Sequence, residues 1–586
     1  MLHTLLILAV FATNLPPPTS QSCFKATESQ CRNVDFAPGS DLAGEGFDIT
    51  TMERKGAFVI DMSSWLQKDK SCTLCKNPYL KGQTQKLPVS VLDWKPSQKC
   101  KMKVSSSVYQ SSEALVSAST SSIDNNWKIG LQIITPKVQG SLMLAGSNSK
   151  LAEYSMGKTK EDKYSFTSHA VSCGYYSYRI SSSPLLHPEL SNEFGNLPEI
   201  YDESTKHLYY KLIDKFGTHY ITKVTLGGEV HSVTSIKECE ATLQGLSVDE
   251  VKMCLDVEAS VSMGIKVNLQ TEAHHCKQSK DKTLSKKSFS SSFSDRETNV
   301  IGGHTQNVDL LFSSNNDPKA YKEWVSSLPA HPDVLSYSLE PLHELLPAKT
   351  QKRVHLRNAI KDYILQRALL KKCASPCKIG VKTNPKEPCS CTCHNKPDVA
   401  LNCCPTQRGA AQVTITVIKA TGLYGDYLTQ TDAYVKILLN GKINRGQTSR
   451  ILNNDSPIWN ENFNLGTVEL TQYRSVILQV WDEDSDSDDD LLGECRVSLK
   501  SDKNICGLNY GTLYYEVQVK CIHGLAGPSC MEYKPSPMEP QLEKVYVSRN
   551  ARPIPRGMLL EMGVLLDERI PRFNQSNIHK AKGLEL

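Results

Sequence analysis

A long alternation of apolar and polar residues runs from Leu255 to Gln270. The apolar positions are Leu255, Val257, Ala259, Val261, Met263, Ile265, Val267 and Leu269. Successive side chains of a β-strand point to opposite faces, so this pattern is typical of a strand with one apolar and one polar face. Globular proteins use strands of about 5–6 residues, and a tilted strand crosses a bilayer with about 9–11. Two interpretations follow: an amphipathic strand of a soluble sheet, or a strand that crosses a membrane.

Shorter patterns predict helices and strands before residue 373 and strands alone in the later part of the chain. Trp127 to Ile133 alternates like a strand, whereas Ser204 to Gly217 starts with an N-cap residue and ends with glycine, as helices do. Apolar spacing also predicts helices around Trp324 and from Val354 to Lys372. From about residue 409 to 530, short alternating strands separated by turn residues predict an all-β domain.

Length and composition indicate a globular protein of several domains. The chain has 586 residues, of which 39% are hydrophobic and 22% charged. A net charge of +5 is small for this length and argues against nucleic acid as a partner. The apolar run from Leu5 to Ala12, followed by small residues near Ser20, predicts a secretory signal over residues 1–20. No later apolar run reaches the roughly 18 residues of a spanning helix.

The 20 cysteines all follow that signal, so we expect a secreted, disulfide-bonded protein. Cys72 and Cys75 are expected to pair with Cys23 and Cys31 rather than to bind zinc. Seven cysteines lie between residues 373 and 404, a segment too short to hold a core without disulfides. Three bonds within it leave one cysteine, which we expect to join this module to the preceding domain.

The most concentrated chemistry is an acidic loop after residue 481. Its aspartates are Asp482, Asp484, Asp486, Asp488, Asp489 and Asp490. Carboxylates at this density repel one another unless a cation neutralises them, and Ca²⁺ takes 6–8 oxygen ligands in flexible geometry. A second acidic loop carries Asp426 and Asp432. The sequence therefore predicts a calcium site built from two loops.

Three stretches, "GDYLTQTDAYVK", "NDSPIWNENF" and "VWDEDSDSDDDLLG", resemble in order the first ligand loop, an internal signature and the second ligand loop of the C2 domain. The resemblance implies an eight-stranded β-sandwich that binds lipid through calcium. It implies as ligands Asp426, Asp432, Asp482, Asp484 and Asp490, with Asp489 as a substitute for Asp490. Tyr424 and Tyr427 lie in the first loop, where they either contact a membrane or pack within the turn.

The stretch "YYKLIDKFGTHYITKVTLGGEV" resembles the signature of the membrane attack complex/perforin family. The motif residues are Tyr209, Phe216, Gly217, Thr218, His219, Tyr220, Gly227 and Gly228. We expect His219 to be structural rather than catalytic, and the glycine pair to permit a bend in a strand. The chain lacks GxSxG, HExxH and P-loop motifs, so we expect no enzyme.

The order of these motifs predicts an α+β fold in four parts. A membrane attack complex/perforin domain over residues 21–372 would contain a bent antiparallel sheet flanked by helical clusters. A cysteine-rich module like an epidermal growth factor repeat (373–408), an all-β C2 sandwich (409–530) and a C-terminal tail (531–586) would follow. The tail carries a predicted N-glycosylation site at Asn574.

The resemblance implies a secreted, calcium-dependent, pore-forming cytolysin. Such a protein would be stored in secretory granules, dock on the phospholipid membrane of a target cell, assemble into a ring of identical subunits and deliver co-secreted proteases. Lys211 and Glu340 are candidates for opposite charges across the subunit contact. Two other functions remain open: a non-lytic adhesion or signalling protein of the same fold, and a calcium-dependent lipid-modifying enzyme.

In this family the two helical clusters unfurl into β-hairpins that close a barrel. Leu255 to Gln270 lies where the second cluster should begin, so its apolar row would face lipid and its polar row the lumen. We expect the return limb around residues 283–294 and the first cluster between residues 139 and 179. Tyr164 to Ala170 alternates within that first cluster.

Overall fold

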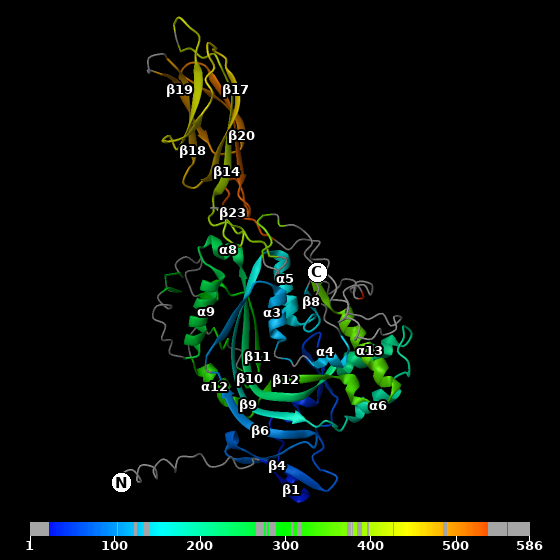
Figure 1. The fold of residues 1–586 in the computed structure, drawn as a ribbon. Coiled ribbons are helices and arrows are strands. Elements are labelled where there is room, and N and C mark those ends of the chain that lie inside the picture. The colour runs from blue at the N-terminus through cyan, green and yellow to red at the C-terminus, as the bar shows by residue number, and fades with distance from the viewer. Residues whose placement is uncertain are drawn as a thin grey trace, which may run out of the picture.

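The computed structural model describes most of the chain between residues 23 and 536. The described residues are 23–101, 103–121, 123, 126–133, 141–264, 275–276, 278–279, 289–305, 309–312, 318–371, 377, 379–383, 390–394, 398–425, 427–484, 489–536 and 560. A large mixed domain comes first, a small disulfide-rich module follows, and a β-sandwich stands at the far end of the elongated molecule (Figure 1). The predicted α+β fold and the order of its parts are confirmed.

Two long strands form the centre of the large domain. β9 (Tyr164–Ile180) and β10 (His219–Lys237) pair antiparallel, from Arg179 opposite Lys223 to Tyr164 opposite Lys237. The other strands of this sheet are β2 (Glu45–Asp48), β3 (Glu53–Phe58), β6 (Val91–Cys100), β7 (Ser105–Tyr109), β11 (Arg296–Ile301) and β12 (Asp333–Pro341). The sheet curves strongly around its middle (Figure 1).

The predicted glycine pair lies near the middle of β10. An ideal Cβ on Gly227 would come within 2.0 Å of the Cys173 carbonyl oxygen, and one on Gly228 within 2.2 Å of the Leu328 side chain. The pairing of β9 with β10 shifts register between Leu226 and Gly227. Both glycines are therefore required for close packing across the bend.

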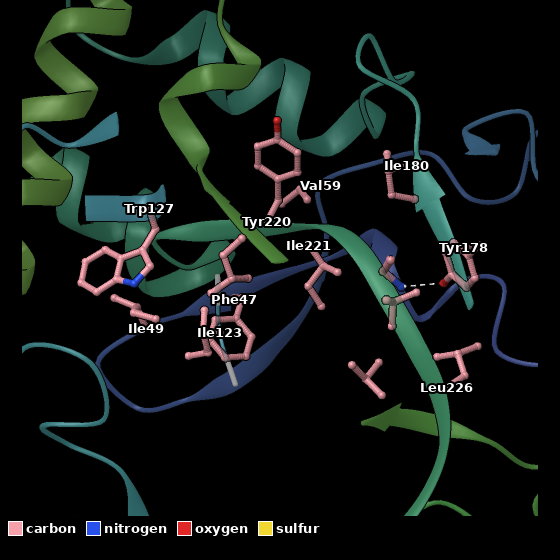
Figure 2. Packing of buried hydrophobic residues seen from close by; sticks show 14 of the residues in the cluster. Phe47, Ile49, Val59, Ile123, Trp127, Tyr178, Ile180, Tyr220, Ile221 and Leu226 are labelled. Atoms are coloured by element: carbon pink, nitrogen blue, oxygen red, sulfur yellow. Dashed lines mark hydrogen bonds between the residues drawn. The ribbon is translucent and has the colours of Figure 1, made fainter. Parts of the chain in front are cut away.

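The rest of the family motif joins helix α7 (Lys206–Phe216) to β10. Gly217 ends the helix at φ 84°, a conformation that suits glycine. The Thr218 hydroxyl donates to the Phe47 carbonyl and accepts from the Ile49 amide at 3.0 Å. Tyr209 and Phe216 are fully buried in the core beside these strands. Figure 2 shows part of the same buried cluster, with Phe47, Ile123 and Ile221 on one side of β10 and the Tyr220 ring on the other.

Helices cover the sheet on both sides of β9 and β10 (Figure 1). One group contains α3 (Ser112–Ser119), α4 (Asn126–Gly130) and α5 (Lys150–Glu161), and the other contains α8 (Glu238–Leu243), α9 (Val248–Ser262), α11 (Phe289–Ser292) and α12 (Lys319–Ser327). Helices α6 (Pro188–Asn196), α7 and α13 (Gln351–Gln366) lie at one end of the sheet. Within the described residues, no helix has the length and apolar character needed to span a bilayer.

Three expected elements differ. Trp127 to Ile133 was predicted to be a strand, but its first residues belong to helix α4. Trp127 and Leu131 are about one helical turn apart, and both are buried. Tyr164 to Ala170 belongs to the central strand β9 rather than to the first cluster. The helix predicted from Val354 ends at Gln366, and β13 (Leu369–Lys371) then pairs with β8 (Ser141–Met143).

Disulfides tie the parts together as the cysteine pattern predicts. Cys23–Cys75 and Cys31–Cys72 close the N-terminal strands β1 (Cys23–Thr27) and β4 (Ser71–Asn77), which pair beside β5 (Gln83–Lys86). Within the small module, Cys377 bonds to Cys391 and Cys393 to Cys403. The cysteine expected to join the module to the preceding domain is Cys404, which bonds to Cys239 beside the end of β10.

The sandwich has the eight strands predicted for a C2 domain. Its first sheet contains β14 (Ala410–Thr421), β17 (Ile458–Glu469), β20 (Asp502–Gly507) and β21 (Thr512–Cys521), and its second contains β15 (Ala433–Leu439), β16 (Ile443–Gln447), β18 (Ser475–Asp482) and β19 (Asp490–Ser498). The chain then pairs β22 (Leu525–Ala526) with β23 (Glu532–Tyr533) and returns to the large domain, where the Tyr533 hydroxyl donates to Asp162 at 2.7 Å.

Candidate functional site

The predicted calcium ligands gather at one end of the sandwich. The pairing of β18 with β19 places Asp482 directly opposite Asp490, and Asp432 precedes the first residue of β15, which pairs with Asp482. Asp484 follows β18 into the acidic loop. Asp426 lies outside the described residues. The strand register therefore brings Asp432, Asp482 and Asp490 together although 58 positions separate the first from the last in the sequence.

Asp482 is the most buried of the described carboxylates in this group. Its side chain is buried, at 2% exposure, and Oδ1 accepts from the Asp432 amide at 2.6 Å. The backbone at Gly425 crosses so close that an ideal Cβ there would lie 1.6 Å from Oδ2 of Asp482. Only glycine allows the first loop to come this close to the Asp482 carboxylate. In the sequence, this glycine is marked by the Gly-Asp pair at the start of the predicted ligand loop.

Two neighbouring aspartates accept hydrogen bonds from other parts of the sandwich. Oδ1 of Asp432 accepts from the Asn453 amide at 2.7 Å, and Oδ2 of Asp489 accepts from the Tyr434 hydroxyl at 2.6 Å. Burial, together with that bond to Asp489, raises the pKa of Tyr434 far above its ordinary value. Because Tyr434 engages Asp489, the exposed Asp490 is the more available of the two for a cation.

The donor chemistry of this end of the sandwich suits calcium. The carboxylates are hard oxygen donors carried by loops, as Ca²⁺ prefers. Among the described residues, however, no three His, Cys, Asp or Glu side chains converge closely enough to hold a metal ion. Asp426 and residues 485–488 of the acidic loops lie outside the described residues.

Exposed aromatic and aliphatic side chains lie at the same end of the sandwich. Tyr427 and Leu428 are almost fully exposed, at 90% and 91%, which excludes turn packing for Tyr427. Tyr424 is half-exposed, and its ring lies 5.8 Å from that of Tyr510. The sequence patterns did not predict Leu428 or Tyr510. Leu428 adjoins Tyr427, but Tyr510 reaches this surface from the loop between β20 and β21, which only the topology reveals.

The first half of the alternating stretch, from Leu255 to Ser262, is helical. It begins inside α9, which a capping box starts: Ser247 and Glu250 exchange side-chain to backbone bonds of 2.8 and 3.2 Å. The soluble amphipathic strand is therefore wrong. Leu255, Ala259 and Met263 follow one another at helical spacing and are buried in the core, whereas Val261 is 42% exposed. Ile265, Val267 and Leu269 lie outside the described residues.

Polar contacts hold α9 against the sheet and against α11. Nε2 of His169, on β9, lies 3.3 Å from Asp256. Burial raises the pKa of Asp256, but hydrogen bonds from His169 and Lys252 lower it more, so the carboxyl stays below its usual range. The Glu258 carboxylate accepts from the amides of Phe289 and Ser290, at 2.8 and 2.9 Å, and so caps α11. The described end of the expected return limb is thus helical here too.

The remaining predicted residues are His219, the charged pair Lys211 and Glu340, and Asn574. His219 is fully buried, its Nδ1 lies 2.7 Å from the Thr218 hydroxyl, and burial next to His343 lowers its pKa to about 3, as a structural histidine requires. Lys211 is exposed on α7, and Glu340, on β12, accepts from the Tyr220 hydroxyl at 2.7 Å. Asn574 lies outside the described residues.

Comparisons with known proteins agree with these parts. The family description "MAC/Perforin domain" matches residues 36–372, "Perforin-1-like, EGF domain" matches 372–406 and "C2 domain" matches 411–511.

Among curated relatives, Perforin-1 of Homo sapiens is 39% identical over 542 residues, covering 91% of this chain and 97% of that protein. Perforin-1 of Rattus norvegicus is 38% identical and covers 91% of this chain and 96% of that protein. The complement component C8 alpha chain of Oryctolagus cuniculus is 23% identical over 63% of this chain and 66% of that protein. The family match spans more than half of the chain, and the Perforin-1 relatives cover nearly all of it. This chain therefore belongs to the membrane attack complex/perforin family.

Proposed function

We propose that this protein is a secreted, calcium-dependent, pore-forming cytolysin. The observation that carries the proposal is that the apolar positions starting in α9 suit both a helix and a strand. Leu255, Ala259 and Met263 form a buried helical face here, while the complete alternating set would lie on a single face in an extended β conformation. A segment that satisfies both geometries suits a change from soluble helix to lipid-facing strand. Barrel closure pairs every backbone group and so permits strands to enter lipid.

Docking would begin at the sandwich. Asp426, Asp432, Asp482, Asp484 and Asp490 would hold the calcium, which supplies positive charge and open coordination positions for lipid phosphate oxygens. The exposed Tyr427 and Leu428 follow Tyr424 in the same loop, and the Tyr424 ring packs against Tyr510. Aromatic side chains favour the interface between lipid and water. This arrangement orients the chain with its calcium loops on a phospholipid membrane.

Assembly and delivery would follow docking. Lys211 and Glu340 carry opposite charges on α7 and on β12, as a contact between neighbouring copies in a ring would require. The completed pore would pass co-secreted proteases into the target cell. The relatives named Perforin-1 support secretion and storage in granules before release.

The test is leakage of a dye from phospholipid liposomes, with and without calcium. Asp482→Ala should lose liposome binding at calcium concentrations that support the unaltered protein, because it removes the central carboxylate. Asp426→Ala tests the first loop in the same way. Asp502→Ala is the matched control, since Asp502 is an exposed aspartate at the opposite end of β20 from the Tyr510 loop. Equal binding by Asp482→Ala and Asp502→Ala would contradict the assigned site.

The same assay separates the alternatives. Binding that needs calcium but releases no dye from the liposomes would favour a non-lytic adhesion or signalling protein. Release of free fatty acid from the liposomes would favour a lipid-modifying enzyme.

A further inference from the structure

Strands β10 and β11 pair with a constant register. Glu229 lies opposite Ile301 and Thr234 opposite Arg296, and no bulge interrupts the pairs between them. In each pair the two residue numbers therefore add up to 530. The strands leave the sheet at the same end, where β10 finishes at Lys237 and β11 starts at Arg296. A hairpin that extends this ladder without a bulge would keep the same relation between its partners.

The disulfide between Cys254 and Cys276 satisfies that relation, because 254 and 276 also add up to 530. In the soluble form it joins α9 to the segment containing Cys276, and both cysteines are buried. Their Cα atoms are 5.4 Å apart. Directly opposed residues of an antiparallel pair are about 4.5–5.5 Å apart. The bond thus already joins two residues that extension of the β10–β11 ladder would place opposite each other.

We propose that the Cys254–Cys276 disulfide persists through membrane insertion and fixes the register of the second hairpin. This inference rests on the proposed pore-forming function and specifies its inserting segment. The hairpin then turns at residue 265, which leaves ten residues of each limb between disulfide and turn. Each limb therefore matches the roughly 9–11 residues that a tilted strand needs to cross a bilayer.

The sequence between the cysteines fits this register. Because the numbers of paired residues add up to 530, an odd-numbered residue always lies opposite another odd-numbered residue. Directly opposed side chains point to the same face, so the odd-numbered residues of both limbs share one face of the hairpin. Odd positions of the first limb are Leu255, Val257, Ala259, Val261 and Met263, and those of the second are Val267, Leu269, Thr271, Ala273 and His275. Even positions of the second limb are Lys266, Asn268, Gln270, Glu272 and His274. The odd-numbered face is apolar along the first limb and at Val267, Leu269 and Ala273 of the second, with Thr271 and His275 towards the disulfide. The even-numbered face of the second limb is polar throughout, as the lumen side of a barrel requires.

The intact bond excludes the return limb expected at residues 283–294. If residues 255–270 formed a single membrane-crossing limb, Cys254 and Cys276 would flank a strand of about 50 Å. A disulfide joins Cα atoms that are usually less than about 7 Å apart. The lysine- and serine-rich sequence from 277 to 292 would instead lie outside the bilayer, opposite residues 238–253.

Cross-linking of paired cysteines tests this register. Glu240→Cys with Ser290→Cys lies on the register, whereas Glu240→Cys with Ser292→Cys is two residues off. Each double variant is bound to phosphatidylcholine liposomes with calcium and treated with a short cross-linker specific for free thiols. Calcium-free protein gives the baseline. We expect the 240–290 pair to react at least about tenfold faster than the 240–292 pair, and peptide mapping to recover Cys254 bonded to Cys276.

Dye leakage from the same liposomes distinguishes the possible failures. Dye release with an opened Cys254–Cys276 bond, or with equal reaction of the two pairs, would overturn the register and leave pore formation standing. Binding without dye release and without cross-linking of either pair would overturn pore formation and the register together. Preferred 240–290 cross-linking with the native bond intact would support both.

Discussion

At the scale of single residues, α9 shows why an alternating pattern did not predict the soluble fold. A set of positions two apart contains a subset four apart, and that subset forms one face of a helix. Leu255, Ala259 and Met263 are this subset and are buried in the core. The chemistry of the acidic loops could be predicted from the sequence, but the hydrogen bond from Tyr434 that occupies Asp489 could not, because it depends on strand pairing.

Val261→Arg is the sharpest residue-scale test of the lipid face. Val261 is 42% exposed in the soluble helix, so arginine there should leave folding, secretion and docking intact. In a lipid-facing strand it costs about 2–4 kcal/mol near the bilayer midplane. That cost recurs in every subunit of a ring. We therefore expect Val261→Arg to bind liposomes with calcium and to release little or no dye.

The control must lie on the polar row of the same helix. Ser262 is unsuitable because it is 2% exposed in the soluble form, where arginine would disrupt the core. Ser260 is half-buried and also belongs to the polar row, so Ser260→Arg should retain most of the leakage activity. Leakage by Val261→Arg equal to that of the unaltered protein would refute the lipid-facing assignment, provided that both variants melt at similar temperatures.

At the scale of elements, helix α5 lies across the ends of the central strands. It directly precedes β9, yet its Tyr154 hydroxyl donates to the Asp295 carbonyl at 2.9 Å and its Lys158 ammonium lies 2.7 Å from the Asp295 carboxylate. Asp295 immediately precedes β11. The first helical group is thereby held to the base of the second, a relation that no local sequence pattern predicts. By contrast, α7 and α12 were predicted because their apolar spacing, and the Gly217 that ends α7, are local signals.

Weakening this contact should ease the opening of both groups. Lys158→Met removes a partly buried ion pair, for which about 1 kcal/mol is a reasonable value. That corresponds to a roughly fivefold rise in the population of opened α5. We expect faster dye leakage at unchanged liposome binding, and faster amide hydrogen exchange in α5 of the soluble protein. Lys150→Met is the matched control on the same helix, since its ion pair with Glu53 is largely exposed. Equal effects of the two variants would contradict the contact's role.

At the scale of the whole molecule, the small module and the sandwich meet the large domain where its central strands end. Cys404 bonds to Cys239, two residues beyond β10, and Tyr533 reaches Asp162, two residues before β9. The leftover cysteine predicted a bond between domains, but not its position. The return of the chain after the sandwich could not be predicted, because residues 531–536 carry no pattern of their own. The sandwich that we propose to dock on membranes is thus attached at the base of the segments proposed to insert.

Acid should destabilise the large domain through two buried histidines. His219 and His343 are both buried, and burial lowers the pKa of each to about 3, assisted at His343 by the positive charges of Arg353 and Arg357. In the unfolded chain the imidazoles titrate near pH 6.5. Below that pH the unfolded state binds more protons than the folded state, so stability falls as pH decreases from about 6.5 towards 3. Each histidine contributes at most about 1.4 kcal/mol per pH unit in this window.

Thermal melting of the full chain in calcium-free buffer, from pH 7.5 to 5.0, measures this dependence. We expect little change above pH 6.5 and a steady loss of melting temperature below it. His219→Gln and His343→Gln should each reduce the slope by up to about half of the two-histidine contribution, because glutamine takes up no proton when it unfolds. The slope is the decisive quantity, since either variant also alters packing and shifts the melting temperature at every pH. A slope unchanged in both variants would assign the acid sensitivity to other groups. A reduced slope would assign the acid sensitivity to the junction of α7, β10 and β12. The family motif is located at this junction, where the Thr218 carbonyl accepts from the Leu342 amide at 3.0 Å.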